Sequence, residues 1–177
     1  LKTGANVFLT GEPGSGKTHT VNAYVSWLRK RRIEPAITAS TGIAATHIGG
    51  FTIHSWSGIG VRQNLSKYDL DAISQNKNVS RRVRDAQVLI IDEISMVRAD
   101  LLDCIDVFLR MYGPDETRPF GGVQMIFIGD LYQLPPVVSG DEKEIFNSFY
   151  PTPYFFSARV MQDCALEMIE LEEVYRQ

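Results

Sequence analysis

The sequence predicts an α/β fold built on a parallel sheet with helices on both faces. Short apolar runs at residues 7–9, 88–91 and 123–128 alternate with segments whose apolar residues recur at helical spacing. Apolar strands of this kind are typical of a parallel sheet buried on both sides, and their alternation with helices is typical of βαβ units. A glycine-rich turn after the first apolar run opens the first helical segment and supports the same class.

The elements follow one another in a regular order. Val21, Tyr24, Val25 and Leu28 recur at helical spacing and predict an amphipathic helix over residues 17–32. A buried second strand is predicted just beyond Pro35, at residues 36–39. The remaining predicted elements are strands at residues 88–91, 123–128 and about 167–171, a turn-rich loop at 114–122, and a helix whose core stripe is Leu101, Leu102, Ile105, Phe108 and Leu109.

Residues 57–85 differ in composition from the rest of the chain. They are rich in polar side chains and end in the basic run at 81–84. An apolar side persists, however, in Leu65, Tyr68, Leu70 and Ile73. We therefore predict an insertion of short helices outside the sheet, not a linker.

Length and composition indicate one domain of 177 residues, in which 44% hydrophobic residues are ample for a core. The formal net charge of -3 gives no overall attraction to nucleic acid, so any such contact must be local. Cys104 and Cys164 lie in apolar surroundings without metal-ligand spacing, and we predict reduced core residues of an intracellular protein. No signal peptide or long apolar span indicates secretion or a membrane. From the sequence at its two ends, we expect the chain to be one domain of a longer protein.

Residues 11–18, with the sequence GEPGSGKT, match the phosphate-binding pattern G-x-x-x-x-G-K-[ST] between a strand and a helix. Glycines let the backbone turn tightly, so that several N–H groups point at a polyphosphate. Lys17 is then expected to reach the β- and γ-phosphates, and the Thr18 hydroxyl to ligate Mg²⁺, beside the positive end of a helix. The predicted nucleotide-binding residues are Gly11, Pro13, Gly14, Ser15, Gly16, Lys17, Thr18 and His19.

Polar residues also follow the other predicted strands. In a parallel sheet ligands bind beyond the carboxyl ends of the strands, so residues 40–41, 92–93 and 129–133 should meet the phosphate-binding loop at one edge. Asp92 is placed to hold Mg²⁺ through water, and Glu93 to polarise an attacking water. This pair favours hydrolysis of the nucleotide over transfer of phosphate to a metabolite.

Two further side chains are candidates for sensing the γ-phosphate. Gln133 can hydrogen-bond both that phosphate and the attacking water, and Arg176 can stabilise the charge that spreads over the transferring group. Taken singly, neither is a specific signal.

Three features allow more than one interpretation. The basic run at residues 29–32 suits a helix C-terminus, or else forms a nucleic-acid patch. An aromatic side chain such as Phe51 or Trp56 can stack on a base, but Trp56 is equally a candidate for the core. His54 is either a loop histidine or a contact for a nucleic-acid strand.

Six motifs occur in a fixed order and together resemble a known family. They are GEPGSGKT at 11–18, TASTGIAA at 38–45, TIHSW at 52–56, IDEISMV at 91–97, GDLYQLPPV at 129–137 and YRQ at 175–177. The chain resembles the first RecA-like domain of the Pif (petite integration frequency) family of DNA helicases, superfamily 1B, over residues 1–177. Its fold is a P-loop NTPase sheet with helices on both faces and a small inserted sub-domain.

The resemblance implies an ATP-driven motor that moves 5′ to 3′ on single-stranded DNA and separates forked or structured duplexes in replication, repair, recombination or telomere maintenance. It implies that Lys17, Thr18 and Asp92 serve ATP and Mg²⁺, that Glu93 activates water, and that Gln133 and Arg176 sense the γ-phosphate. Residues 57–85 resemble the sub-domain that splits the duplex. The residues implied along the DNA are Ser40, Thr41, Gly42, Thr52, His54 and Ser55.

The family's adenine-recognition motif lies before its P-loop, and its second RecA-like domain lies beyond residue 177, so neither falls within this sequence. We therefore expect the isolated chain to bind nucleotide weakly, hydrolyse it slowly and unwind nothing alone. Its partners would be DNA and the other domains of the same helicase, which we expect to be a monomer. It would act in the cytoplasm of a bacterium, or in the nucleus or mitochondrion of a eukaryote.

Three rival interpretations exist. A small-molecule P-loop kinase needs a lid of arginines and a substrate pocket, and the carboxylates at 92–93 together with Gln133 speak against it. A GTPase selects guanine with Asn-Lys-x-Asp, and residues 76–79 begin in this way but lack the Asp. The third is a repair or conjugation helicase of the same superfamily, which only the missing domains would distinguish.

Overall fold

The computed structural model describes residues 1–60 and 67–173. Within these residues the chain forms a six-stranded sheet in the order β3-β2-β4-β5-β1-β6, and every pair of neighbouring strands is parallel. This confirms the predicted α/β class. The strands are β1 (Asn6–Gly11), β2 (Ala36–Ala39), β3 (Phe51–Thr52), β4 (Val88–Asp92), β5 (Gln124–Ile128) and β6 (Leu166–Leu171).

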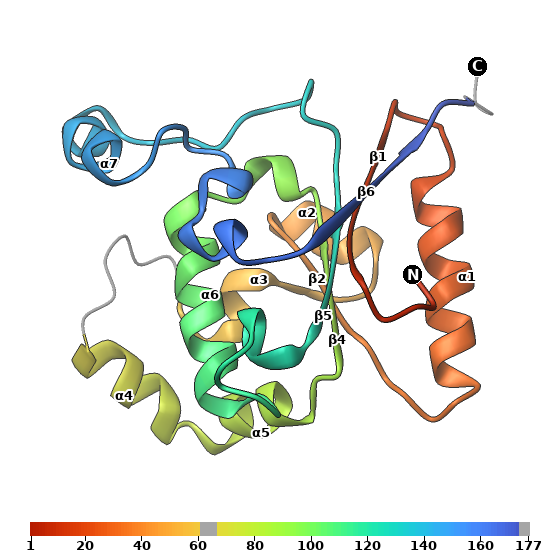
Figure 1. Ribbon diagram of the computed structural model, residues 1–177, viewed down its shortest axis with the longest axis horizontal. Coiled ribbons are helices and arrows are strands. Elements are labelled where there is room, and N and C mark those ends of the chain that lie inside the picture. Colours follow the sequence, from red (N-terminus) through yellow and green to blue (C-terminus); the bar gives the residue numbers. More distant parts are fainter. Residues whose placement is uncertain (61–66, 174–177) are drawn as a thin grey trace.

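Helices cover both faces of this sheet. Figure 1 shows α1 on one side and α3, α5 and α6 on the other, with α7 carried outward at the end of a long connection. The helices are α1 (Lys17–Arg29), α2 (Gly42–His47), α3 (Ile53–Ser57), α4 (Lys67–Gln75), α5 (Lys77–Asp85), α6 (Ala99–Tyr112) and α7 (Lys143–Phe149). Short 3₁₀ turns lie at Ile94–Met96, Pro119–Gly122, Gly140–Glu142, Phe155–Ser157 and Arg159–Gln162.

Two hydrophobic cores flank the sheet, and consecutive strand residues alternate between them. In β1, Val7 and Leu9 pack toward α1, whereas Phe8 packs toward α6. β4 and β5 alternate in the same way because successive side chains of a strand point to opposite faces. Both faces of the central strands are therefore buried, as their continuous apolar sequence predicts.

The first helix is shorter than its sequence pattern predicts. The predicted core residues Val21, Tyr24, Val25 and Leu28 are all buried, but α1 ends at Arg29 and not at residue 32. Beyond that point the N–H of Arg32 still bonds to the carbonyl of Arg29, while Arg32 itself turns into the left-handed region at φ 61°. The chain reverses there and leads through Pro35 into β2.

The last strand lies at an edge of the sheet and is less covered than the others. β6 pairs with β1 alone among the described strands. Met168 and Ile169 remain 65% and 39% exposed, although a strand covered on both faces was predicted. The difference arises because an edge strand has a neighbour on one side only.

Helices occur within the insertion predicted at residues 57–85. Ser57 is fully buried in α3, and the inserted helices are α4 and α5. Their apolar side is formed by Ile73, Val79 and Val83, whereas Tyr68 is 86% exposed and does not belong to it. Leu65 and the side chain of Leu70 lie outside the described part of the chain.

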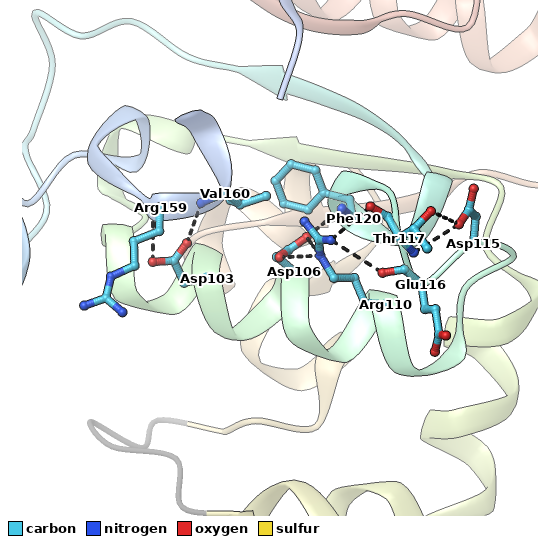
Figure 2. Close-up of polar contacts among 9 residues, drawn as sticks. All are labelled: Asp103, Asp106, Arg110, Asp115, Glu116, Thr117, Phe120, Arg159 and Val160. Carbon is cyan, nitrogen blue, oxygen red and sulfur yellow. Dashed lines mark hydrogen bonds and ion pairs between the residues drawn. The ribbon is translucent and has the colours of Figure 1, made fainter. Parts of the chain in front are cut away.

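Two carboxylates on α6 tie distant loops to the core, as Figure 2 shows. Asp103 accepts hydrogen bonds from the backbone N–H groups of Arg159 and Val160 at 3.1 and 3.0 Å. Asp106 accepts from the N–H of Phe120 at 2.6 Å and is also bound by Arg110. α6 thus holds two segments in place, the one that precedes β5 and the one that follows it.

The two cysteines form no disulfide, as the sequence predicts. Cys104 and Cys164 are both free, and the Cys164 sulfur accepts a hydrogen bond from the Asn6 amide at 3.3 Å. Burial raises the pKa of Cys104 to about 11. In the described part of the chain, no helix combines the length and the apolar character needed to cross a bilayer.

Candidate functional site

The carboxyl ends of the strands bring the predicted motifs to one edge of the sheet. The N–H of Ser40, just after β2, donates to the carbonyl of Asp92 at the end of β4 over 3.1 Å. The N–H of Gly129, just after β5, donates to the carbonyl of Leu9 in β1 over 3.2 Å. These bonds place the loops after β1, β2, β4 and β5 side by side, which is the convergence that the sequence predicts.

The loop between β1 and α1 has the backbone of a phosphate cradle. Gly14 and Gly16 adopt φ values of 86° and 93°, a region that glycine enters without steric cost. No side chain caps the N-terminus of α1, so its first N–H groups and the positive end of its dipole face the loop. Thr18 and His19 lie exposed in this first turn.

Lys17 and Ser15 complete the cradle. The Lys17 ammonium donates to the carbonyl oxygens of Gly11 and Glu12 at 2.6 and 3.0 Å, so it lies across the loop. The Ser15 Oγ atom is buried and has no hydrogen-bond partner among the described residues. A buried hydroxyl without a partner, beside a lysine and a helix start, fits an anion with several oxygens. The residues present therefore fit a nucleotide polyphosphate.

Gly11 permits this close packing. A Cβ atom at position 11 would lie 2.6 Å from the Leu171 carbonyl oxygen and 2.7 Å from Ser15 Oγ. Both distances are far shorter than a normal contact. The cradle therefore rests directly against the end of β6, and only glycine leaves room for it.

The acidic residues at the end of β4 lie beside Lys17. The pKa of Asp92 is raised by burial, and the N–H of Glu93 and the charge of Lys17 oppose this rise. The pKa of Glu93 is raised by burial and by the neighbouring carboxylate of Asp92, with Lys17 again opposing and Asp130 adding to the rise. Four charged groups thus share one partly desolvated corner beside the cradle.

Asp130 is a member of this corner to which the sequence analysis gave no role. It lies two residues beyond the end of β5, is only 7% exposed, and accepts a hydrogen bond from the N–H of Tyr132 at 2.9 Å. The signal for it was the Gly-Asp pair that follows a buried strand, near the strand end as Asp92 is at the end of β4.

The donor set suits Mg²⁺ held together with a nucleotide. In the described residues, no group of three or more His, Cys, Asp or Glu side chains is arranged as a metal cage. Mg²⁺ bound to phosphates needs only one or two protein ligands and keeps several waters. The Thr18 hydroxyl and the Asp92 carboxylate can supply these two.

Of the two residues expected to sense the γ-phosphate, one lies within the described part of the chain. Gln133 is exposed, and its backbone N–H bonds to the carbonyl of Asp130 at 3.1 Å, so only its backbone is anchored nearby. Tyr132 beside it is 99% exposed. Arg176 lies outside the described residues.

The candidate strand-binding residues lie in the loops after β2 and β3. The hydroxyl of Thr41 accepts from the N–H of Ala44 and caps α2, and that of Thr52 accepts from the N–H of Ser55 and caps α3. Each hydroxyl keeps its own hydrogen for a phosphate oxygen. Gly42 and Ser55 are exposed.

Ser40 makes a different contact. Its hydroxyl oxygen is buried and has no partner among the described residues. Its backbone N–H donates to the carbonyl of Asp92. Ser40 therefore joins the loop after β2 to the end of β4.

The structure decides the alternative for Trp56 and describes the surroundings of Phe51 and His54. Trp56 is 4% exposed and belongs to the core, so it cannot stack on a base. Phe51 is 55% exposed and remains a candidate for stacking. His54 is half-buried, and burial lowers the pKa of its imidazole, which favours the neutral form.

Comparison with known proteins adds independent information. A family model described as PIF1-like helicase matches residues 1–177. An ATP-dependent DNA helicase Pif1 from Psychrobacter sp. is 46% identical over the whole chain, which corresponds to 26% of that protein. The chain therefore spans about a quarter of the length of this curated relative.

Solved structures agree. The crystal structure of Pif1 helicase from Candida albicans matches 99% of this chain and 38% of that chain, with a TM-score of 0.86 and 37% identity. A Bacteroides Pif1 helicase in complex with ADP-AlF3 and ssDNA matches 98% of this chain and 39% of that chain, with a TM-score of 0.76 and 39% identity. The family model covers the whole sequence, and the sheet carries the nucleotide cradle at the expected edge. The chain belongs to the PIF1-like helicase family.

Proposed function

We propose that this chain is the first RecA-like domain of a DNA helicase that hydrolyses ATP to move 5′ to 3′ along single-stranded DNA and to separate duplexes. The observation that carries the proposal is the phosphate cradle, in which Lys17 bonds the carbonyls of Gly11 and Glu12 and the Ser15 hydroxyl is buried without a partner among the described residues. The raised pKa values of Asp92 and Glu93 beside Lys17 support it. The similarity to a Bacteroides helicase in complex with ADP-AlF3 and ssDNA supports the proposal that this domain binds a nucleotide and single-stranded DNA.

The chemistry follows from the groups in this corner. Lys17 and the N-terminus of α1 hold the β- and γ-phosphates, and Thr18 and Asp92 hold Mg²⁺. When bound, the metal neutralises charge on the phosphates. Glu93 acts as the general base toward the attacking water, and its raised pKa makes it a stronger base than an exposed glutamate.

Gln133 and Arg176 are proposed to sense the γ-phosphate. Gln133 is anchored to Asp130 by its backbone, which keeps its exposed side chain near the corner. Transition-state charge on a transferring phosphoryl group is stabilised by such donors, an arginine above all.

The DNA strand is proposed to lie across the loops after β2 and β3. Thr41, Gly42, Thr52, His54 and Ser55 offer hydroxyls, backbone and an imidazole, which bind phosphodiester oxygens without reading the base sequence. The bond from the N–H of Ser40 to the carbonyl of Asp92 joins the strand-binding loop to the catalytic acid.

The proposal extends to assembly and location. We infer that a monomer acts, that α4 and α5 form the part that meets the duplex at a fork, and that the other domains of the full-length protein supply adenine recognition and the second half of the cleft. The relatives come from bacteria and eukaryotes. The corresponding locations are the bacterial cytoplasm, or the nucleus or mitochondrion.

The test uses the full-length protein and two substitutions. Lys17→Ala should abolish nucleotide binding or turnover, and Glu93→Gln should retain ATP binding while hydrolysis falls by about 10²–10⁴-fold. Unwinding is measured on forked DNA with either a 5′ or a 3′ single-stranded tail. Unwinding from the 3′ tail alone, or full turnover by Lys17→Ala, would refute the proposal. Formation of a phosphorylated metabolite would point to a kinase instead.

A further inference from the structure

Arg82 of the inserted helix α5 contacts residues 51–55, which carry the candidate strand-binding residues Thr52 and His54. Arg82 of α5 donates a hydrogen bond from Nη2 to the carbonyl oxygen of Ser55 in α3 over 2.6 Å. The guanidinium carbon of Arg82 also lies 5.8 Å from the centre of the Phe51 ring in β3. One side chain therefore contacts residues at both ends of the segment that carries Thr52 and His54.

Arg82 is unlike the other basic residues of α5. Its Nε atom is buried without a hydrogen-bond partner in the described residues, and burial lowers its pKa. Arg84 is exposed, and Arg81 is exposed and forms an ion pair with Asp85 at 3.7 Å. Burying part of a cation against a neutral carbonyl costs free energy, so we expect Arg82 to have a structural or functional role at this position.

Apolar contacts from the insertion hold the other end of α3. Gly58 ends this helix with φ 74°. A Cβ atom at that position would lie 3.1 Å from Val79 Cγ2 and 3.2 Å from Ile73 Cγ2, so α4 and α5 rest directly on it. Ile53 and Trp56 of α3 lie in the same core as Ile73, Val79 and Val83.

We propose that Arg82 is a positioning residue for DNA binding, which holds α3 and the exposed ring of Phe51 in the orientation that grips a single strand. It thereby links the position of the inserted helices to the grip of the domain on the strand. The guanidinium fork is required because it bonds the Ser55 carbonyl and lies beside the Phe51 ring at the same time, which a lysine ammonium cannot reproduce. This inference rests on the proposed function.

The experiment compares Arg82→Met, Arg82→Lys and the matched control Arg84→Met in the full-length protein. Binding of fluorescent oligo(dT) is measured by anisotropy, and ATP hydrolysis is measured as a function of oligo(dT) concentration. Arg82→Met is expected to weaken binding by about tenfold, the loss of one charge-assisted hydrogen bond. The oligo(dT) concentration for half-maximal stimulation should rise by the same factor, while the maximal rate changes much less. Arg84→Met should bind as the wild type does.

Two comparisons separate positioning from simple attraction of phosphate. Arg82→Lys keeps the charge, so if it binds as the wild type does, the guanidinium geometry is irrelevant and the inference is overturned. In a His54→Ala background, Arg82→Met should weaken binding by less than about twofold, because the segment that it positions is already impaired. Full additivity of the two substitutions would also overturn the inference.

The outcomes distinguish this inference from the proposed function. A wild-type protein that does not bind oligo(dT) would refute the proposed function itself. Tight binding by the wild type, together with equal binding by Arg82→Met, would refute only the role of Arg82. Thermal unfolding of each variant shows whether it is folded. If Arg82→Met is unfolded, the binding measured for Arg82→Lys decides whether Arg82 has this positioning role.

Discussion

The backbone N–H of Glu93 donates a hydrogen bond to the carboxylate of Asp92 over 2.9 Å. Glu93 itself has left-handed backbone angles, φ 54° and ψ 44°, an arrangement that costs about 1–2 kcal/mol for a residue with a Cβ. Residues in this region concentrate at functional sites. The strained turn lets two consecutive carboxyl groups occupy one corner with different surroundings.

The pKa of Glu93 predicts how stability depends on pH. Burial and the neighbouring Asp92 raise this pKa in the folded protein, so the folded state holds its proton more tightly than the unfolded state does. The contribution of Glu93 to stability therefore falls as the pH rises from its pKa in the unfolded state to its higher pKa in the folded state, and it remains lower at neutral pH. Glu93→Gln should raise the Tm at pH 7, and the gain should shrink as the pH falls toward 4.5, the ordinary pKa of the group.

Thermal unfolding of both proteins between these pH values checks this expectation. Glu144→Gln is the matched control, because Glu144 is exposed on α7 and should leave the Tm unchanged at every pH. A Tm of Glu93→Gln below that of the wild type at pH 7 would contradict the burial argument.

Gly11→Ala should damage the nucleotide cradle. The added methyl would meet the Leu171 carbonyl oxygen and Ser15 Oγ at 2.6 and 2.7 Å, so the loop or the end of β6 must shift. We expect a loss of about 1–3 kcal/mol in the free energy of unfolding and at least tenfold weaker ATP binding. Urea denaturation and titration with a fluorescent ATP analogue measure the two effects. Gly140→Ala, where a Cβ would meet nothing within 4 Å, should alter neither.

His54→Ala should weaken binding of single-stranded DNA. The imidazole lies half-buried in α3 and is held neutral at pH 7, so it contributes a hydrogen bond and not a full charge. We expect a loss of about three- to tenfold in affinity, measured by anisotropy at fixed salt. His47→Ala, on the exposed end of α2, is the control. Loss of the cooperative unfolding transition in His54→Ala would instead identify His54 as a core residue.

Asp106→Ala should destabilise the protein without touching the nucleotide site. Asp106 is 7% exposed and accepts hydrogen bonds from the N–H of Phe120 and from Arg110, as Figure 2 shows. Its removal leaves a buried N–H and a partly buried guanidinium without their partner. We expect a loss of about 2–4 kcal/mol in urea denaturation. The exposed Asp163→Ala should change stability by less than about 0.5 kcal/mol.

Much of the fold and of the nucleotide site could be predicted from local sequence patterns. Three features depend on the periods of helices and strands and on the backbone freedom of glycine. They are the buried residues of α1, the alternation in β1, β4 and β5, and the placement of Lys17 at a helix start and Asp92 at a strand end. These properties act over a few neighbouring residues. A single sequence therefore displays them directly.

Other features could not be predicted because they depend on which elements become neighbours. The sequence allowed Trp56 to stack on a base, and only the packing of α3 against the sheet shows it buried. It predicted a covered last strand, and the edge position of β6 leaves Met168 exposed.

The sequence by itself determined the α/β class, the strand ends and the chemistry of the cradle, since each is encoded in contiguous residues. Only the tertiary structure decided that Asp130 joins Asp92 and Glu93 beside Lys17 and that Arg82 bonds Ser55, 27 residues away. Such contacts are set by how packed elements meet in space, and neither hydrophobic period nor motif spacing carries that information.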